Sequence, residues 1–441
     1  MDSLRALPKV DALSRSVALA GFPTRVRVEA ARRAIDEMRQ MIQSGTLLKG
    51  QTAEELAVTR ARGMTGKSLR PAINLSGVVL HTGLGRARLA RAAVDQIAAV
   101  AAQHSLLELD DETGKRGNRQ DHVRGLICEL TGAEDAHVVN NAAAAVVLSL
   151  RALAGDREVV LSRGQMVEIG GSFRMPDIVR ESGCRLVEVG TTNKTRINDY
   201  EEALTENCGA VLRCHTSNFK IIGFTEQPPL EQVVHVAHAY GLPCIDDMGT
   251  GCILDTSSFG MVKVPTIQDS LAAGADVVTA SGDKLLGGPQ CGLIVGKRVF
   301  LDRIRKHPLA RAVRIDKLTL AALEATLRLY IQGLEAEVPT IFYLSRPAEV
   351  VKKVAHKLAS CVKGSKVAEG TTEVGGGSAP GTGVSTWRVS LQTDHPDELL
   401  AQLRGFDPPI IARIEGGAVW LDPRTLDDDE VETVCEVLRS L

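Results

Sequence analysis

The sequence predicts an α/β protein with a mostly parallel sheet between helices. Apolar residues make up 44% of the 441 residues and aromatic residues only 3%, so Ala, Val, Leu and Ile must form most of the core. That mixture suits helices covering a parallel sheet better than an all-β sandwich. From about residue 71 onward, short apolar runs alternate with helical stretches, which is the pattern of strands joined by crossover helices.

Seven apolar runs are the candidate strands, and helical stretches lie between them. The runs are residues 137–139, 158–162, 185–189, 210–215, 242–246, 276–280 and 292–295. The helical stretches include residues 143–153, 230–240 and 267–273. Ligands of such sheets bind at the carboxyl ends of the strands. We therefore expect the polar motifs that follow these runs to meet at one edge of the sheet.

The length of the chain predicts two or three domains. Residues 1–70 predict a helical N-terminal domain, with helices at 4–13, 26–42 and 53–60. We expect a cofactor-binding large domain at 71–330 and a small α+β domain at 331–441. Within the small domain, residues 387–391 and 410–421 predict strands. The glycine-rich stretch 369–384 is poor in apolar residues and predicts a mobile loop.

Cysteine usage and hydropathy indicate a cytoplasmic protein. The nine cysteines are odd in number and scattered, and none forms a Cys-x-x-Cys motif, which argues against a disulfide framework or a metal site. The chain opens without a signal-like segment, and its apolar runs are shorter than the 18 residues that a membrane span needs. We therefore expect no membrane association.

The N-terminal segment is basic, although the whole chain has a net charge of −2. Residues 1–70 hold 13 Lys and Arg against 7 Asp and Glu, which leaves 39 against 47 for the remainder. A polyanion partner would account for this balance. A solvated helical surface accounts for it equally well, because Arg32, Arg33 and Arg39 fall among apolar residues at helical spacing. The charge pattern leaves both possibilities open.

Lys284 is the residue on which the functional prediction depends. It lies in Ser-Gly-Asp-Lys-Leu-Leu-Gly-Gly-Pro-Gln, residues 281–290, between two apolar runs. A turn between buried strands is a costly place for a solvated ammonium, but it suits an amine that loses its proton and forms an imine. Ser281 is close enough in sequence to reach the same ligand, and the glycines behind Lys284 leave room for a flat group. The motif indicates an anchor for pyridoxal phosphate.

A lysine in this setting is also compatible with two different roles. Lysines beside glycines are common on exposed turns. Ser-x-x-Lys is also the nucleophile motif of penicillin-binding enzymes, but the Ser-Asp-Asn and Lys-Thr-Gly tripeptides that accompany it do not occur in this sequence. The cofactor prediction therefore depends on the polar residues at the ends of the neighbouring strands.

Asp246 and Asp247 end the apolar run at 242–246 and begin its loop. A carboxylate at that point keeps the ring nitrogen of pyridoxal phosphate protonated, so that carbanion charge can be delocalised into the ring. We favour Asp247 for this role, with Asp246 as the alternative. An ordinary turn acid would occupy the same position.

Two asparagines follow other strands. Asn141 opens a helical run of small residues, and the backbone amides of Asn141, Ala142 and Ala143 form a cradle for the cofactor's phosphate. A plain asparagine cap accounts for this sequence equally well. Asn218 follows residues 210–215 and is placed to hydrogen-bond the oxygen on the cofactor ring, although a turn asparagine is the simpler interpretation.

Five motifs carry a family resemblance. They lie at residues 83–87, 112–117, 162–174, 189–193 and 281–290, and further similarity extends from residues 7–11 to residues 421–426. Together they resemble the bacterial selenocysteine synthases, which are L-seryl-tRNA(Sec) selenium transferases. The resemblance covers nearly the whole chain with matching spacing, so it is more specific than any single motif.

The resemblance implies a pyridoxal phosphate enzyme of fold type I, in which Lys284 carries the cofactor and the helical N-terminal domain grips tRNA. The implied reaction converts L-seryl-tRNA(Sec) to L-selenocysteinyl-tRNA(Sec), by β-elimination of water and addition of selenium from selenophosphate. Lys284 and Asp247 are the expected catalytic residues. Gln165 stands where the family generally has glutamate, and we expect it beside the cofactor, where it cannot act as a base.

The resemblance also implies a selenophosphate site and an oligomer. Arg86, Arg311 and Arg314 correspond to arginines that hold selenophosphate at a subunit boundary, and arginine forks suit a tetrahedral oxyanion. We therefore expect a homo-oligomer, a ring of dimers such as a decamer. The alternative is a lyase of the same superfamily that acts on a small amino acid or sugar acid, since fold and cofactor do not fix the substrate. Such an enzyme has no need of a basic N-terminal segment.

Overall fold

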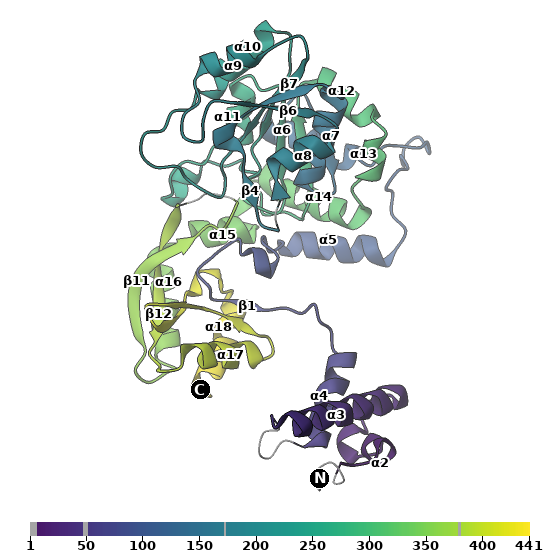
Figure 1. The fold of residues 1–441 in the computed structure, drawn as a ribbon, viewed down its shortest axis with the longest axis vertical. Helices are drawn as coiled ribbons and strands as arrows, with labels where there is room; N and C mark the ends of the chain where they lie inside the picture. The colour runs from purple at the N-terminus through teal and green to yellow at the C-terminus, as the bar shows by residue number, and fades with distance from the viewer. Residues whose placement is uncertain (1–6, 47–51, 172, 378–380) are drawn as a thin grey trace. The chain divides into compact units, whose positions relative to one another are not determined.

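The computed structural model describes residues 7–46, 52–171, 173–377 and 381–441. It divides into two compact units, Met1–Ala72 and Ile73–Leu441, which are coloured purple and blue to yellow in Figure 1. Among its described residues, the second unit contains a large seven-stranded sheet, a small four-stranded sheet and two two-stranded sheets. Among the described helices, none combines the length and the apolar character that a membrane span requires. The further division of the second unit at residue 330 stays a prediction.

The first unit is a small helical bundle. It contains α2 (Val10–Ser14), a short 3-10 turn at Val17–Leu19, α3 (Thr24–Ser44) and α4 (Ala53–Thr65). α3 ends at Gly45 in the left-handed conformation, and α4 begins at a capping box that Thr52 forms with Glu55. The predicted helices at 26–42 and 53–60 are confirmed by α3 and α4. The predicted helix at 4–13 is shorter, since α2 begins at Val10, and residues 4–6 lie outside the described residues.

Several arginines of this unit form ion pairs at the helix surface. Arg32 and Arg33 both bind Glu29, and all three lie on α3. Arg60 of α4 reaches across to Glu37 of α3 with an N···O distance of 2.6 Å. These side chains remain partly exposed, so each pair contributes little to stability.

The large sheet has seven strands in the order β2-β10-β9-β8-β7-β3-β6. The strands are β2 (Asp135–Val139), β3 (Glu158–Ser162), β6 (Arg185–Val189), β7 (Cys208–Cys214), β8 (Cys244–Asp247), β9 (Val277–Ser281) and β10 (Gly292–Gly296). Among these described strands, β10 runs antiparallel to the other six. All seven predicted strands are confirmed, and the sheet is mostly parallel as expected.

Helices cover both faces of the large sheet, because successive strand residues point to opposite sides. On one face α7 (Ala142–Leu153), α8 (Met175–Glu181) and α12 (Arg298–Lys306) pack on residues such as Val139 and Ile245. On the other face pack α6 (Asp121–Thr131), α9 (Ile197–Ala203), α10 (Leu230–Ala239), α11 (Ile267–Ala272) and α14 (Lys317–Ile331). α5 (Arg91–Ala102) lies against α14. These two cores confirm the predicted α/β class, with a sheet between helices (Figure 1).

The small sheet has four antiparallel strands in the order β11-β12-β15-β14. They are β11 (Lys366–Glu373), β12 (Gly383–Leu391), β15 (Ala418–Leu421) and β14 (Arg413–Glu415). β1 (Ile73–Asn74) pairs in parallel with β13 (Ile410–Ile411) beside it. The helices of this part are α15 (Pro339–Ser345), α16 (Ala348–Ala359), α17 (Pro396–Gly405) and α18 (Asp428–Arg439). The predicted strands at 387–391 and 410–421 are confirmed.

The prediction of a loop over the whole of residues 369–384 is wrong. Residues 369–373 belong to β11 and residues 383–384 to β12, which pair from Lys366 with Ser390 to Glu373 with Gly383. Backbone pairing holds this hairpin, so it needs few apolar side chains. Val374 beyond β11 is fully buried. The hairpin extends from the small sheet toward the large sheet (Figure 1).

We predict that Gly292→Ala destabilises the protein by about 1–3 kcal/mol. A Cβ at Gly292 on β10 would lie 2.2 Å from the backbone oxygen of Asn141, so the start of α7 would have to shift. Thermal unfolding measures this effect. Gly125→Ala on α6 is the matched control, since a Cβ there meets no atom within 4 Å. It should be neutral or stabilising, and equal melting temperatures for the two variants would contradict the prediction.

Candidate active site

The carboxyl ends of three neighbouring parallel strands form the site. β7, β8 and β9 lie side by side, with Cys214 paired to Asp247 and Asp247 paired to Thr279. The motif that carries Lys284 begins at the last residue of β9, and His215 follows β7 directly. The register of the sheet therefore brings Asp247, the motif that carries Lys284, and His215 to one edge.

Lys284 is buried, with 5% of its surface exposed. Its Nζ donates a hydrogen bond to the carbonyl oxygen of Gly377 at 2.8 Å. Burial lowers the pKa of Lys284, and the charge of Arg86 lowers it further, whereas Asp247 and Asp283 oppose the shift. Because burial desolvates the ammonium, it shifts the equilibrium of Lys284 toward the neutral amine, which is the nucleophilic form.

Asp247 and Asp246 have different surroundings, because they point to opposite sides of β8. Asp246 is fully buried and has both carboxylate oxygens occupied, one by Arg213 at 3.0 Å and the other by Ser270 at 2.6 Å. Asp247 accepts one hydrogen bond, from Thr279 Oγ1 at 2.7 Å. Burial raises the pKa of Asp247 to about 6, although Thr279 and Lys284 lower it. Of the two acids, Asp247 is the one with an oxygen that the described residues leave available to a ligand.

Ser281 and Arg86 meet through a residue that the sequence did not single out. Asp283 accepts a hydrogen bond from Ser281 Oγ at 2.5 Å and from Arg86 Nη1 at 2.9 Å. Arg86 has a positive φ of 61°, which is strained for a residue with a side chain. The three side chains form a chain of contacts next to Lys284. The Ser281 hydroxyl therefore has an internal partner in addition to any ligand.

The start of α7 offers two unused backbone donors. Asn141 caps the helix, with its Oδ1 accepting from Ala144 N at 2.8 Å and its backbone oxygen accepting from Ala145 N. The amides of Ala142 and Ala143 have no acceptor among the described residues. An asparagine cap and a phosphate cradle are thus compatible. The cap binds the amide of Ala144 and leaves the amides of the first two helical residues available to an anion.

Asn218 and Gln165 lie near the end of β7. Asn218 Nδ2 donates to the backbone oxygen of Glu168 at 2.5 Å, and its Oδ1 is buried without a partner among the described residues. The side chain of Gln165 is buried, and its Oε1 accepts from the amide of Cys214 at 3.2 Å. Gln165 therefore binds the end of β7, whereas the Oδ1 of Asn218 has no hydrogen-bond donor among the described residues.

Arg311 and Arg314 line a different pocket of about 340 Å³. Arg314 donates to Glu108, which also binds Arg116 and Arg119. Desolvation lowers the pKa of Arg314, and the positive charges of Arg119 and Arg311 lower it further. Arg86 is not among the residues that line this pocket, so within one chain the structure does not bring the three predicted selenophosphate arginines together.

Three contributors to the site were missed by the sequence reasoning. His215 is partly buried beside it, and burial followed by the charge of Arg213 lowers its pKa. The sequence offered a signal for His215 and Asp283, since each adjoins a motif already singled out. Gly377 gave no signal, because it reaches Lys284 from the β11–β12 connection across 93 residues.

These residues fit pyridoxal phosphate. Lys284 supplies a buried amine for its aldehyde, Asp247 a carboxylate with an available oxygen, and the amides of Ala142 and Ala143 an anion cradle. The orphaned Oδ1 of Asn218 adds a polar atom that lacks a partner among the described residues. Gly377 permits close approach, since a Cβ there would lie 3.1 Å from Lys284 Nζ.

Relatives of known activity align with nearly the whole chain. A family model described as L-seryl-tRNA selenium transferase matches residues 72–427. The L-seryl-tRNA(Sec) selenium transferase of Carboxydothermus hydrogenoformans is 46% identical over 97% of this chain and 96% of its own. That of Geobacter sulfurreducens is 44% identical over 99% and 98%.

A solved structure shares the fold. The structure of D-glucosaminate-6-phosphate ammonia-lyase superposes with a TM-score of 0.61 over 86% of this chain and 97% of its own, at 24% sequence identity. At that identity the likeness concerns the fold alone, and it agrees with the predicted fold class. The family follows from the sequence matches, which confirm the predicted resemblance: the chain belongs to the L-seryl-tRNA selenium transferase family.

Proposed function

We propose that this chain converts L-seryl-tRNA(Sec) to L-selenocysteinyl-tRNA(Sec) with pyridoxal phosphate as its cofactor. The observation that carries the proposal is the buried amine of Lys284, whose pKa is lowered, at the strand end that also holds Asp247. The substrate is that of the relatives, which are 41–46% identical and named for it. The same site would also suit other amino acids. We therefore infer the substrate from the family and the type of reaction from the geometry of the site.

Pyridoxal phosphate, when bound, supplies an electron sink that makes the α-proton of an amino acid acidic and lets its β-substituent leave. Lys284 is the residue that would hold it. Because its pKa is lowered, the amine of Lys284 is also suited to accept the α-proton and to return it after selenium has been added. Burial excludes water that would compete for that proton.

Asp247 would hold the ring nitrogen in its protonated form. In the cofactor-free site burial raises the pKa of Asp247 to about 6, so the carboxylate gains from a positive partner. Thr279 orients the carboxylate through its hydrogen bond of 2.7 Å. Asp246 is tied to Arg213 and Ser270 and would act only by supporting the strand end.

Arg86, Arg311 and Arg314 would bind selenophosphate. Arg86 lies beside Asp283 and Lys284, whereas Arg311 and Arg314 line a separate pocket. A homo-oligomer supplies the missing link if the pocket of one subunit faces the lysine site of the next. We therefore propose a homo-oligomer, such as a ring of dimers, and we propose the cytoplasm as its location.

The basic first unit would grip the tRNA. Residues Met1–Ala72 form a compact unit of their own, and several arginines on α3 and α4 lie at its surface. Cationic side chains at a surface suit the phosphates of a nucleic acid. Several of these arginines already pair with acidic side chains. On binding tRNA they would exchange those acids for phosphates.

Substitution of the lysine tests the proposal directly. We expect Lys284→Ala to lose covalently held cofactor and to form selenocysteinyl-tRNA at least about a thousandfold more slowly, because proton transfer at the α-carbon loses its base. The rate is measured with seryl-tRNA(Sec) and selenophosphate. Lys263→Ala is the matched control, since Lys263 forms an exposed pair with Asp269. Full activity in Lys284→Ala would contradict the proposal.

The pH dependence of stability tests the surroundings of Asp247. Its folded pKa of about 6 lies above the ordinary 3.8, so the folded protein holds this proton where the unfolded chain releases it. Stability from this group is therefore present at low pH and lost as pH rises through about 6. In the cofactor-free protein, Asp247→Asn should raise stability at pH 7.5 by about 2–3 kcal/mol, and the gain should shrink toward pH 4. A variant less stable than the wild type at pH 7.5 would refute this.

Removal of residues 1–72 tests the role of the first unit. The truncated protein should bind seryl-tRNA(Sec) at least about tenfold more weakly, with a shallower dependence of affinity on salt, because fewer phosphate contacts remain. Filter binding at several salt concentrations gives both quantities, and seryl-tRNA(Ser) is the control ligand. Equal binding of the two tRNAs, or no loss on truncation, would favour a lyase acting on a small substrate.

A further inference from the structure

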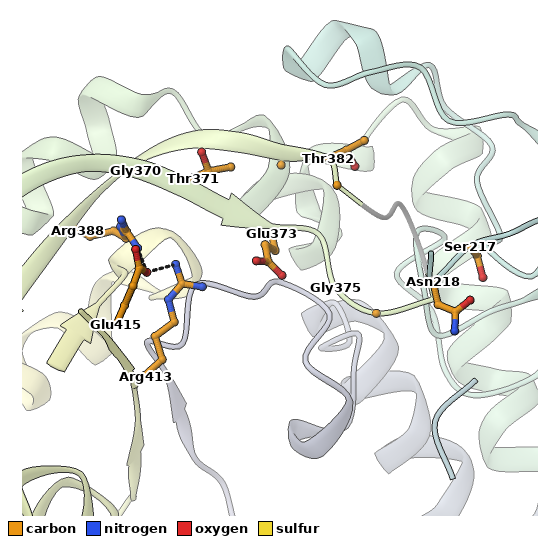
Figure 2. Close-up of a pocket in the computed structure, with 13 residues that line it drawn as sticks. Ser217, Asn218, Gly370, Thr371, Glu373, Gly375, Thr382, Arg388, Arg413 and Glu415 are labelled. Atoms are coloured by element: carbon orange, nitrogen blue, oxygen red, sulfur yellow. Dashed lines mark hydrogen bonds and ion pairs between the residues drawn. The ribbon is translucent and has the colours of Figure 1, made fainter. Parts of the chain in front are cut away.

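A cavity of about 760 Å³ lies between the end of β7 and the small sheet. Figure 2 shows Asn218 on one side and Glu373, Arg388, Arg413 and Glu415 on the other. Glycines of the β11–β12 hairpin make up much of the remaining wall, so backbone is exposed to any occupant. The cavity is within the 300–1,000 Å³ that binding sites for small organic molecules occupy.

The cavity adjoins the catalytic lysine. Gly375 and Gly376 line it, and Gly377, the next residue, accepts the hydrogen bond from Lys284 Nζ. Asn218, on the opposite wall, follows the same strand end as His215. An occupant of the cavity would therefore lie next to the amino acid that reacts at Lys284.

A buried arginine forms part of one wall of the cavity. Arg388 is only 9% exposed, and its Nε is buried with no hydrogen-bond partner among the described residues. Its guanidinium stacks 4.6 Å over the Trp420 ring and binds Glu415 at 2.7 Å. Trp420 and Glu415 therefore hold Arg388 in place, and its side chain brings a positive charge to the cavity wall.

Glu373 and Arg413 add an acceptor and a donor at the cavity. Glu373 ends β11, and Figure 2 shows its carboxylate directed into the open space. The described residues form no side-chain hydrogen bond or ion pair with it. Arg413 of β14 binds Glu415 at 3.3 Å and keeps more than a quarter of its side chain exposed. A ligand that offers a hydroxyl, an anion and a flat ring would satisfy this set.

The reacting substrate requires such a ligand here. In a seryl-tRNA the amino acid is joined by one ester bond to the ribose of the terminal adenosine, so that nucleoside lies within a few bonds of the reacting carbon. Arginine planes stack on bases, and the 2′-hydroxyl donates to carboxylates. Resting on the function proposed above, we propose that this cavity binds the 3′-terminal adenosine of seryl-tRNA. Arg413 would contact the base and Glu373 the 2′-hydroxyl, with Arg388 adding positive charge to the wall.

A stable mimic of the tRNA end tests this assignment. The probe is 3′-deoxy-3′-(L-serylamino)adenosine, in which an amide replaces the ester, and L-serinamide is the same amine without the nucleoside. Calorimetric titration of the holoenzyme should give an affinity for the adenosine compound at least about tenfold above that for serinamide. Equal affinities would overturn the proposal.

Variants locate the binding energy. We expect Glu373→Ala and Arg413→Gln each to weaken binding of the adenosine compound about tenfold or more and to leave serinamide unchanged. Removal of the 2′-hydroxyl from the adenosine compound should weaken its binding to the wild type by a similar factor and leave its binding to Glu373→Ala unchanged. The matched control is Glu369→Ala, on the same strand but outside the cavity wall. Glu373 and Arg413 both lie at the surface of the small sheet, so neither substitution removes a side chain from its core.

The outcomes separate this proposal from the proposed function. A wild type that forms no selenocysteinyl-tRNA refutes the function, whatever the cavity binds. A wild type that forms the product, while Glu373→Ala and Arg413→Gln bind the adenosine compound as tightly as Glu369→Ala does, refutes only the adenosine site. Weakened binding in the two variants, with the control unchanged, supports it.

Discussion

The burial of one amine is the constraint on which the site depends. Lys284 lies at a strand end with 5% of its surface exposed, so its ammonium form loses most of its hydration. The negative charges of Asp247 and Asp283 stabilise the ammonium and raise its pKa, whereas the charge of Arg86 lowers it. The net effect is a lowered pKa of Lys284. A stronger acid pair would raise the pKa of the amine, and an apolar pocket would leave no group to bind a charged ligand. The mixture of charges permits both binding and proton transfer.

The fold assembles this balance from distant parts of the chain. Parallel strands β7, β8 and β9 deliver their terminal residues to one edge, and the start of α7 brings two backbone amides that the described residues leave free. The β11–β12 hairpin then closes on the lysine from the small sheet, where Gly377 accepts its hydrogen bond. Because that contact and the adjoining cavity both depend on the hairpin, the small sheet would take part in the proposed chemistry and in the proposed recognition of the nucleoside.

Sequence reasoning went furthest where local pattern determines structure. Apolar runs bounded by turn residues predicted every strand of the large sheet, and strand ends then predicted Lys284 and Asp247. It favoured Asp247 but left Asp246 open, because the contacts that distinguish them come from Arg213 and Ser270, which lie on other elements. It also mistook β11 for a loop, since backbone pairing with β12 replaces the apolar signal. Contacts between residues far apart in the sequence, such as that of Gly377 with Lys284, leave no pattern in the local sequence.

The central claim is that Lys284 is the residue that holds the cofactor. Borohydride reduction of the holoenzyme fixes pyridoxal phosphate to the lysine that carries it, and peptide mass spectrometry then identifies that lysine. The account predicts the added mass on the peptide that contains Lys284, with other lysines unmodified at one cofactor per chain. Modification of a different lysine, or a protein that takes up no cofactor at all, would contradict it.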